Sequence, residues 1–326
     1  MYARATMTLP YSQFQYAVLI LSALLLFLYG LEHFSKELQT IGSDRLPRWL
    51  GLATHNRLGG FALGASVTAV VQSSSAVSAL VVALVNAGTL SFAGSLAVLL
   101  GAKVGTTSTA WLVSYELTHI GPYLIVLGGL LTMLPFSIRV VGRAIFYFGF
   151  IFFALDLVSS SLEPLRHAPW MLDLLAQAQA PLLGVLLGVV MTVVLQSSSV
   201  VSGLAIVLVQ QGVLEPMGAV AVVVGASLGT TATGLIASIP MDRFARRTAQ
   251  MNLMFNAVGV GLMLPFITPF GEWAVRTGGS PGQAVAIANL AFNLGVALLF
   301  LPFSGWMGRR FSPPGEPTPS ALNAPV

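Results

Sequence analysis

The chain has 326 residues, of which 56% are hydrophobic and only 8% are charged. A soluble domain carries about 25% charged residues, so this chain cannot cover a soluble surface with charge, which indicates an integral membrane protein. It has no cysteine, which excludes disulfides, thiolate metal sites and cysteine nucleophiles. The net charge of +4 is modest, and the placement of the basic residues is more informative than their number.

A helix needs about 20 apolar residues to cross the hydrocarbon core of a bilayer. Seven stretches of that order predict crossings: 14–31, 88–115, 117–138, 143–162, 216–241, 248–271 and 277–308. Two further apolar stretches, 59–87 and 181–212, hold the sequence Gln-Ser-Ser-Ser near their middles. About a dozen helical residues on each side would rise about 18 Å, short of the roughly 30 Å core. Each stretch is therefore either one broken crossing or a re-entrant hairpin.

The basic residues decide between these two possibilities. Eleven of the fifteen form four clusters between the predicted spans: Lys36, Arg45, Arg48 and Arg57; Arg139 and Arg143; Arg243, Arg246 and Arg247; Arg309 and Arg310. By the positive-inside rule all four clusters should face the cytoplasm. They fall on one side only if both stretches are re-entrant. We therefore predict an all-α polytopic protein with about seven crossings and two hairpins, its N-terminus outside and its C-terminus in the cytoplasm.

The two halves of the chain repeat each other. When residue i is aligned with residue i+124, 25 of the 50 positions in 60–109 match those in 184–233. The predicted topology gives the two copies opposite orientations, and inverted repeats of this kind are typical of secondary transporters. We predict a first inverted repeat over 1–138 and a second over 139–305 with extra C-terminal helices. Residues 306–326 are predicted to form a disordered cytoplasmic tail.

Both copies keep the polar sequence that is expensive in an apolar setting: Gln72, Ser73, Ser74 and Ser75, and Gln196, Ser197, Ser198 and Ser199. At a helix break, one half-helix leaves carbonyl groups free and the next presents free N–H groups. The N–H groups and hydroxyls suit an oxyanion, so we expect these eight residues to bind the substrate. The oxygens of Gln72, Ser75, Gln196 and Ser199 also suit sodium. The alternative is that the serines only cap or back-bond a helix.

A second repeated motif reads GAKVGTTSTA at 101–110 and GASLGTTATG at 225–234. Its glycines would allow the helix to unwind. We expect the exposed oxygens to bind sodium at Thr106, Thr107, Thr230 and Thr231. The alternative is that these threonines back-bond within packed helices.

Three more polar residues fall within apolar spans. A charged Lys103 is costly in a membrane core. Its ammonium would either replace one coupling sodium or contact an anionic substrate, unless the side chain snorkels to an interface. Asn256 and Asn293 follow phenylalanine in similar contexts. They would either bind a cation or link helices by hydrogen bonds.

At these residues the sequence resembles the type II sodium–phosphate cotransporter family. The paired Gln-Ser-Ser-Ser and Gly-Ala-x-x-Gly-Thr-Thr motifs carry the resemblance, together with RRTAQMNLMFN at 246–256 and AIANLAFNLGVALLFLP at 286–302. The resemblance implies coupled movement of sodium and inorganic phosphate by alternating access. It also implies that the Gln-Ser-Ser-Ser residues contribute to both sites. This sequence departs from the family at Lys103 and Ser227, where asparagine is usual, and at Asn289, where histidine is usual.

We accordingly expect a multi-pass transporter of the bacterial inner membrane. In the lipid bilayer, a homodimer is one arrangement that it could adopt. We expect no enzymatic activity, cofactor, transition metal or nucleic acid. Two alternatives stay open. One is a sodium- or proton-coupled carrier of another oxyanion or a carboxylate, because hydroxyl and N–H groups do not distinguish between such anions. An intramembrane serine hydrolase is the other, although it needs a base beside a serine and only Lys103 lies at membrane depth.

Overall fold

The computed structural model describes residues 13–42, 56–115, 120–134, 137–162 and 180–311. Within these ranges all regular structure is helical. The bounds are α1 Gln13–Gly42, α3 Arg57–Val71, α4 Ser74–Asn86, α5 Phe92–Ser114, α6 Gly121–Thr132, α7 Ser137–Leu162, α9 Pro181–Leu195, α10 Ser198–Gln210, α11 Pro216–Gly229, α12 Thr231–Ser238, α13 Arg243–Met263, η3 Leu264–Phe266, α14 Ile267–Thr277, α15 Pro281–Phe300, η4 Leu301–Phe303 and α16 Ser304–Phe311.

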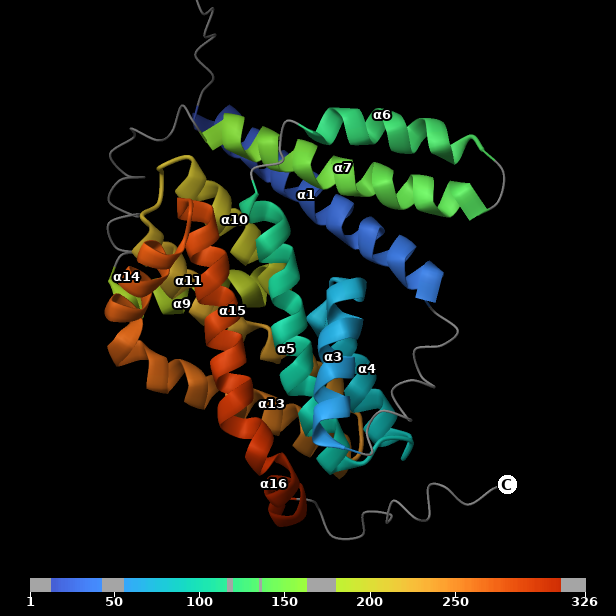
Figure 1. The fold of residues 1–326 in the computed structure, drawn as a ribbon, viewed down its shortest axis with the longest axis vertical. Helices are drawn as coiled ribbons and strands as arrows, with labels where there is room; N and C mark the ends of the chain where they lie inside the picture. The colour runs from blue at the N-terminus through green and yellow to red at the C-terminus, as the bar shows by residue number, and fades with distance from the viewer. Residues whose placement is uncertain (1–12, 43–55, 116–119, 135–136, 163–179, 312–326) are drawn as a thin grey trace, which may run out of the picture.

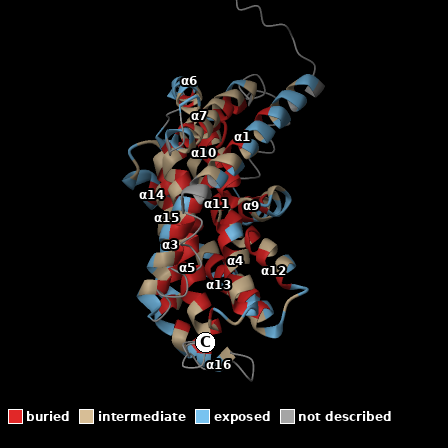
Figure 2. Cartoon of the chain, turned by 90° about the vertical axis from the view of Figure 1, so that its right-hand side faces the viewer, coloured by how far each residue is buried: buried red, intermediate tan, exposed pale blue. Residues whose placement is uncertain are grey.

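The helices form a central group and a flanking group. Helices α5 and α15 run along the long axis of the molecule, with α11 beside them, whereas α1, α6 and α7 cross one end at a steep angle (Figure 1). Buried residues follow the central helices, and exposed residues gather on α1, α6 and α9 (Figure 2). Helix α5 is buried along most of its length, from Phe92 to Ser114.

The outer surface has the composition of a lipid-facing one. On α6 alone, Tyr123 is 76% exposed and Met133, which caps the helix, is 83% exposed. Five helical stretches are long and apolar enough to cross a membrane: Phe92–Ser114, Ile138–Ser161, Pro216–Ser238, Arg243–Thr277 and Pro281–Phe311. The chain is therefore a multi-pass helical membrane protein. The apolar segment of α1, Val18–Phe34, and helix α6 were also predicted as crossings, but both are shorter than this criterion.

Glycines allow two helix pairs to touch backbone to backbone. A Cβ on Gly101 of α5 would lie 1.9 Å from the carbonyl oxygen of Phe61, and one on Gly105 would lie 2.2 Å from that of Ala65. The order of these contacts means that α3 and α5 run in the same direction. The second half repeats the arrangement, because a Cβ on Gly225 of α11 would lie 2.0 Å from the carbonyl oxygen of Val185 in α9. Small residues permit this close packing between membrane helices.

The chain between each such pair folds back on itself. Helix α4 ends at Asn86 and α5 starts at Phe92, so α4 returns the chain to the end at which α3 began. The turn needs a left-handed residue, which Gly88 supplies with φ of 70°. Gly212, with φ of 64°, makes the same turn between α10 and α11.

The two folded-back segments begin at opposite ends of α5. At the first end, Arg57 Nη1 donates to Pro302 O at 2.5 Å, and α16 packs against the start of α5. At the other end, Gln210 Nε2 donates to the carbonyl oxygens of Val113 and Ser114, both at 3.3 Å.

The C-terminal region differs from the sequence prediction. Residues 306–326 were predicted to be disordered, but α16 continues to Phe311. The helix persists because it is packed: Ser304, Met307 and Gly308 are buried. Residues 312–326 lie outside the described ranges.

Candidate substrate-binding site

Both Gln-Ser-Ser-Ser sequences break a helix at the same place. Helix α3 is followed by Gln72 with φ of 56°, and α9 is followed by Gln196 with φ of 55°. A left-handed conformation is uncommon for a residue other than glycine. The next residue caps the following helix: Ser73 Oγ accepts from Ala76 N at 3.2 Å, and Ser197 Oγ accepts from Val200 N at 3.4 Å. The predicted breaks are confirmed.

Hydrogen bonds from the neighbouring helix hold each glutamine. Gln72 Oε1 accepts from Thr109 Oγ1 at 2.6 Å, and Gln72 Nε2 donates to Ser108 Oγ at 3.0 Å. In the second half, Gln196 Oε1 accepts from Thr233 Oγ1 at 2.7 Å. The amide oxygens thus have a structural role, because they fix the strained residue at each break.

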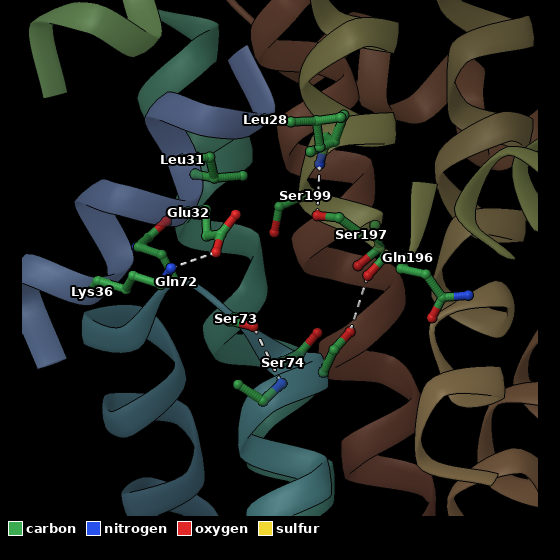
Figure 3. A pocket seen from close by; sticks show the side chains of 14 residues that line it. Leu28, Leu31, Glu32, Lys36, Gln72, Ser73, Ser74, Gln196, Ser197 and Ser199 are labelled. Atoms are coloured by element: carbon green, nitrogen blue, oxygen red, sulfur yellow. Dashed lines mark hydrogen bonds and ion pairs between the residues drawn. The ribbon is translucent and has the colours of Figure 1, made fainter. Parts of the chain in front are cut away.

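The two breaks meet at one cavity of about 480 Å³. Its lining includes all eight residues of the two motifs. Ser75 Oγ donates to Gln196 O at 3.4 Å, and the hydroxyl oxygens of Thr109 and Ser199 lie 3.5 Å apart, so the two halves touch directly. Figure 3 shows the serines of both motifs turned toward the same space. The bond from Ser75 to Gln196 joins segments that lie 121 residues apart in the sequence.

Helix α1 closes one side of this cavity. Its contribution is Leu28, Leu31, Glu32 and Lys36. Lys36 Nζ lies 2.6 Å from Glu32 Oε1, and both side chains face the serines across the cavity (Figure 3). Lys36 belongs to the first basic cluster, and neither residue was among those expected to bind a solute. The signal for them was present, because Glu32 and Lys36 are the charged pair that directly follows an apolar span.

The expected unwinding at the second motif was wrong for the first copy. Helix α5 runs unbroken through Gly101 and Gly105, because these glycines serve the close contact with α3. In the second copy α11 ends at Gly229 and α12 begins at Thr231, and Thr230 between them has helical dihedrals (φ −62°, ψ −23°).

The threonines that were predicted to bind sodium donate hydrogen bonds to carbonyl oxygens of their own helices. Thr106 Oγ1 donates to Ala102 O at 2.9 Å, and Thr107 Oγ1 to Val104 O at 2.8 Å. The second copy matches, with Thr230 to Ala226 O at 2.9 Å and Thr231 to Leu228 O at 2.7 Å. These four side chains do not line the cavity.

Lys103 lies in the protein core and apart from the cavity lining. Its side chain is buried, and Nζ donates to Ser227 O at 2.9 Å. Ser227 is the residue that corresponds to position 103 in the second copy. The ammonium therefore does not snorkel to an interface.

The two asparagines donate mainly within their own helices. Asn256 Nδ2 donates to Asn252 O at 2.8 Å, and Asn293 Nδ2 donates to Asn289 O at 2.8 Å. Asn293 also reaches Ser227 Oγ at 3.5 Å. Both asparagines are buried away from the cavity, and the bond from Asn293 to Ser227 Oγ joins α15 to α11.

Other residues of the site carry a signal that the sequence analysis did not use. Thr109 and Thr233 match in the repeat, and each lies 37 positions after its glutamine. Within the described residues, two buried hydroxyls lack a hydrogen-bond partner, Thr68 and Thr192. They occupy equivalent positions too, four residues before each glutamine.

Comparisons with known proteins agree with this arrangement. A family model described as Na+/Pi-cotransporter matches twice, over residues 26–160 and 167–302. An "Uncharacterized protein YqeW" of Bacillus subtilis is 31% identical over 86% of this chain and 92% of its own length. The "Putative inorganic phosphate export protein YjbB" of Escherichia coli is 28% identical over 89% of this chain, which spans 54% of that protein. The human "Sodium-dependent phosphate transport protein 2B" is 30% identical over 38% of this chain and 20% of its own length. No solved structure matches. Two family matches that together cover most of the sequence show that the chain belongs to the Na+/Pi-cotransporter family.

Proposed function

We propose that this protein is a secondary active transporter that couples sodium movement to transport of inorganic phosphate by alternating access. The observation that carries the proposal is the single cavity lined by both Gln-Ser-Ser-Ser sequences. A substrate bound there contacts both halves of the chain at once. Membership of the Na+/Pi-cotransporter family supports phosphate as the substrate.

The chemistry of the cavity suits an oxyanion. Helices α4 and α10, each of 13 residues, begin at the cavity with Ser73 and Ser197 as their caps. The positive ends of two helix dipoles and the unpaired N–H groups of the first turns attract negative charge there. The hydroxyls of Ser74, Ser75, Ser198 and Ser199 add donors that phosphate oxygens accept. We assign these serines to phosphate binding.

Sodium requires oxygen ligands in the same region. Hydroxyls and backbone carbonyls at the two breaks supply them, including Gln196 O, which Ser75 already contacts. Ser75 and Ser199 are our candidates for ligands shared by both solutes. We also propose further sodium ligands, because a hydroxyl that donates to its own helix keeps lone pairs for a cation. These are Thr106, Thr107, Thr230 and Thr231.

The course of the chain supports two re-entrant hairpins in inverted repeats. The α3–α4 segment starts and finishes at one end of α5, and the α10–α11 turn lies at the other. Opposite entry of two equivalent hairpins is the arrangement that alternating access uses. Phosphate and sodium would then reach the tips from either side in turn.

Lys103 bears on the number of coupled ions. Because its ammonium is buried beside Ser227 O and away from the cavity lining, substitution for a sodium is favoured over direct contact with the substrate. We expect Lys103→Asn to increase the cooperativity of transport with respect to sodium. An unchanged sodium dependence would contradict this role.

Two other functions are less well supported. Another small oxyanion or a carboxylate could use the same donors, and the experiment below includes them as competitors. A serine hydrolase needs a base hydrogen-bonded to its nucleophile. Within the described residues, the serines at the breaks bond only to backbone groups and to Thr109.

Uptake of labelled phosphate into proteoliposomes tests the proposal. We expect uptake that requires a sodium gradient, and counterflow when unlabelled phosphate is present on the opposite side. Sulfate and succinate should compete weakly. Phosphate uptake without sodium dependence would contradict the coupling, and strong inhibition by sulfate or succinate would redirect the substrate. Both gradient directions should be measured, because the name of the Escherichia coli relative specifies export.

A further inference from the structure

One ion pair supplies the formal charges at the cavity. Among its described lining residues, Glu32 and Lys36 are charged and the others are glutamine, serine, alanine, valine or leucine. The pair is close, with 2.6 Å between Lys36 Nζ and Glu32 Oε1, yet both side chains are well exposed, at 59% for Lys36 and 62% for Glu32. The pair therefore lies at the wall of the cavity and is not buried in protein.

We propose that Glu32 and Lys36 form an exchangeable charge pair that binds both transported solutes. A phosphate oxygen takes the place of the carboxylate at the Lys36 ammonium. The carboxylate of Glu32, released from Lys36, becomes a ligand for the coupling cation. This inference rests on the proposed function and adds two binding residues to it.

The charges of the solutes require such groups. Phosphate at neutral pH carries between one and two negative charges, whereas the serine hydroxyls are neutral and a helix N-terminus offers only about half a positive charge. A cationic donor to phosphate makes a stronger hydrogen bond than a neutral donor. A carboxylate is in turn a preferred ligand of a hard cation, and the eight motif residues hold no carboxylate.

The weakness of the pair is what makes it exchangeable. An exposed ion pair between residues i and i+4 contributes little to stability, because water screens both charges. Separating the two charges costs little free energy, so it subtracts little from the free energy of solute binding. The separation also links the two solutes. Anion binding at Lys36 frees Glu32 and so raises affinity for the cation, and by thermodynamic reciprocity the cation raises affinity for the anion.

Only one half of the chain provides this pair. Position 156, the equivalent of Glu32, is also acidic, but Asp156 does not line the cavity, and position 160, the equivalent of Lys36, is a serine. The second half has thus kept the polar sequence at its break without the charge pair beside it. The two Gln-Ser-Ser-Ser sequences contribute alike, whereas the charges come from α1 alone.

The test compares four variants in proteoliposomes: Lys36→Gln, Glu32→Gln, the exchanged pair Glu32→Lys with Lys36→Glu, and a control. The control is Glu272→Gln with Arg276→Gln, which removes another exposed i,i+4 pair of the same order, on α14, with 3.4 Å between its charged atoms. We expect Lys36→Gln to raise the KM for phosphate about tenfold, as loss of a charge-assisted hydrogen bond does. We expect Glu32→Gln to raise the KM for sodium by a similar factor. The control should stay within about twofold of wild type.

The exchanged pair separates binding from a structural role. If the pair only stabilises α1, the exchange restores the ion pair and wild-type transport, which would overturn the inference. If the residues bind solutes, both KM values stay raised, because each charge now faces the wrong solute. Wild-type KM values in both single variants would also overturn it while leaving the proposed function intact. If the wild-type chain takes up no phosphate, the proposed function and this inference fail together.

Discussion

Gln72 and Gln196 hold equivalent backbone positions under unequal exposure. The bond from Thr109 to Gln72 is 2.6 Å and the bond from Thr233 to Gln196 is 2.7 Å. Gln72 is buried, with 7% of its surface exposed, whereas Gln196 is exposed. Loss of the same hydrogen bond therefore leaves an unpaired oxygen in the protein core at one break and an exposed oxygen at the other.

This difference predicts unequal effects of two matched substitutions. Thr109→Val should destabilise the protein by about 1–3 kcal/mol, the cost of an unsatisfied buried polar group. Thr233→Val should cost less than half as much, because water replaces the lost partner. Thermal unfolding in detergent measures both. Equal shifts in the unfolding midpoint would show that the two breaks are equally protected from water.

The site was only partly predictable at this scale. The eight residues at the breaks stand out in the sequence because they are polar residues in an apolar repeat, and all eight line one cavity. Thr109 was missed although it matches Thr233, because its role depends on α5 lying parallel to α3. Glu32 and Lys36 were missed because their place at the cavity depends on how α1 packs.

The helix pairs α3–α5 and α9–α11 depend on the absence of side chains at their contact. A Cβ on Gly101 would lie 1.9 Å from a carbonyl oxygen of the partner helix, and a Cβ on Gly225 would lie 2.0 Å from one. From the sequence, these glycines were expected to let the helix unwind, since a glycine near a polar motif suits an unwound segment. The structure assigns them to packing, and only the partner helix could reveal that.

Substitution by alanine distinguishes packing from flexibility. Gly101→Ala should destabilise the protein by about 1–3 kcal/mol, because its Cβ would lie 1.9 Å from Phe61 O and must push α3 away. Gly129→Ala in α6 is the control, because nothing lies within 4 Å of its Cβ. That change should stabilise its helix by about 0.5–1 kcal/mol. Thermal unfolding in detergent reports both, and a stabilising Gly101→Ala would contradict the packing role.

At the scale of the whole molecule, the positions of the basic residues predict the side on which each proposed hairpin opens. Four exposed positions mark the hairpin ends: Leu58 and Ala87 for the first, Ala180 and Glu215 for the second. Two re-entrant hairpins place the first two in the cytoplasm and the last two outside. If either segment crossed the membrane once, its two end positions would lie on opposite sides of the membrane.

Single cysteines test this prediction directly, because the chain has none of its own. We expect a membrane-impermeant maleimide to label Leu58→Cys and Ala87→Cys only in inside-out vesicles. Ala180→Cys and Glu215→Cys should be labelled only in right-side-out vesicles. The unsubstituted chain is the blank. Opposite labelling of Leu58→Cys and Ala87→Cys would replace the first hairpin by a crossing.

The helical class and most of the long helices followed from composition and apolar length alone. The angle at which α1, α6 and α7 cross the other helices did not, because it depends on contacts between segments far apart in sequence (Figure 1). The repeat was visible as identities, and a substrate bound by all eight polar residues implied that its two polar sequences meet, but the contacts between them came only from the structure. An alignment shows which residues are equivalent and leaves open whether they touch.

The contact between Lys103 and Ser227 has a consequence for how such a chain could arise. Equivalent residues that touch each other lie beside the axis that relates the two halves. In an ancestor made of two identical subunits, that position would face its own copy. Two lysines there would bring two ammonium groups into the same part of the protein core. The chain instead sets Lys103 opposite a serine, an arrangement that needs two halves of different sequence and that no symmetric precursor can have.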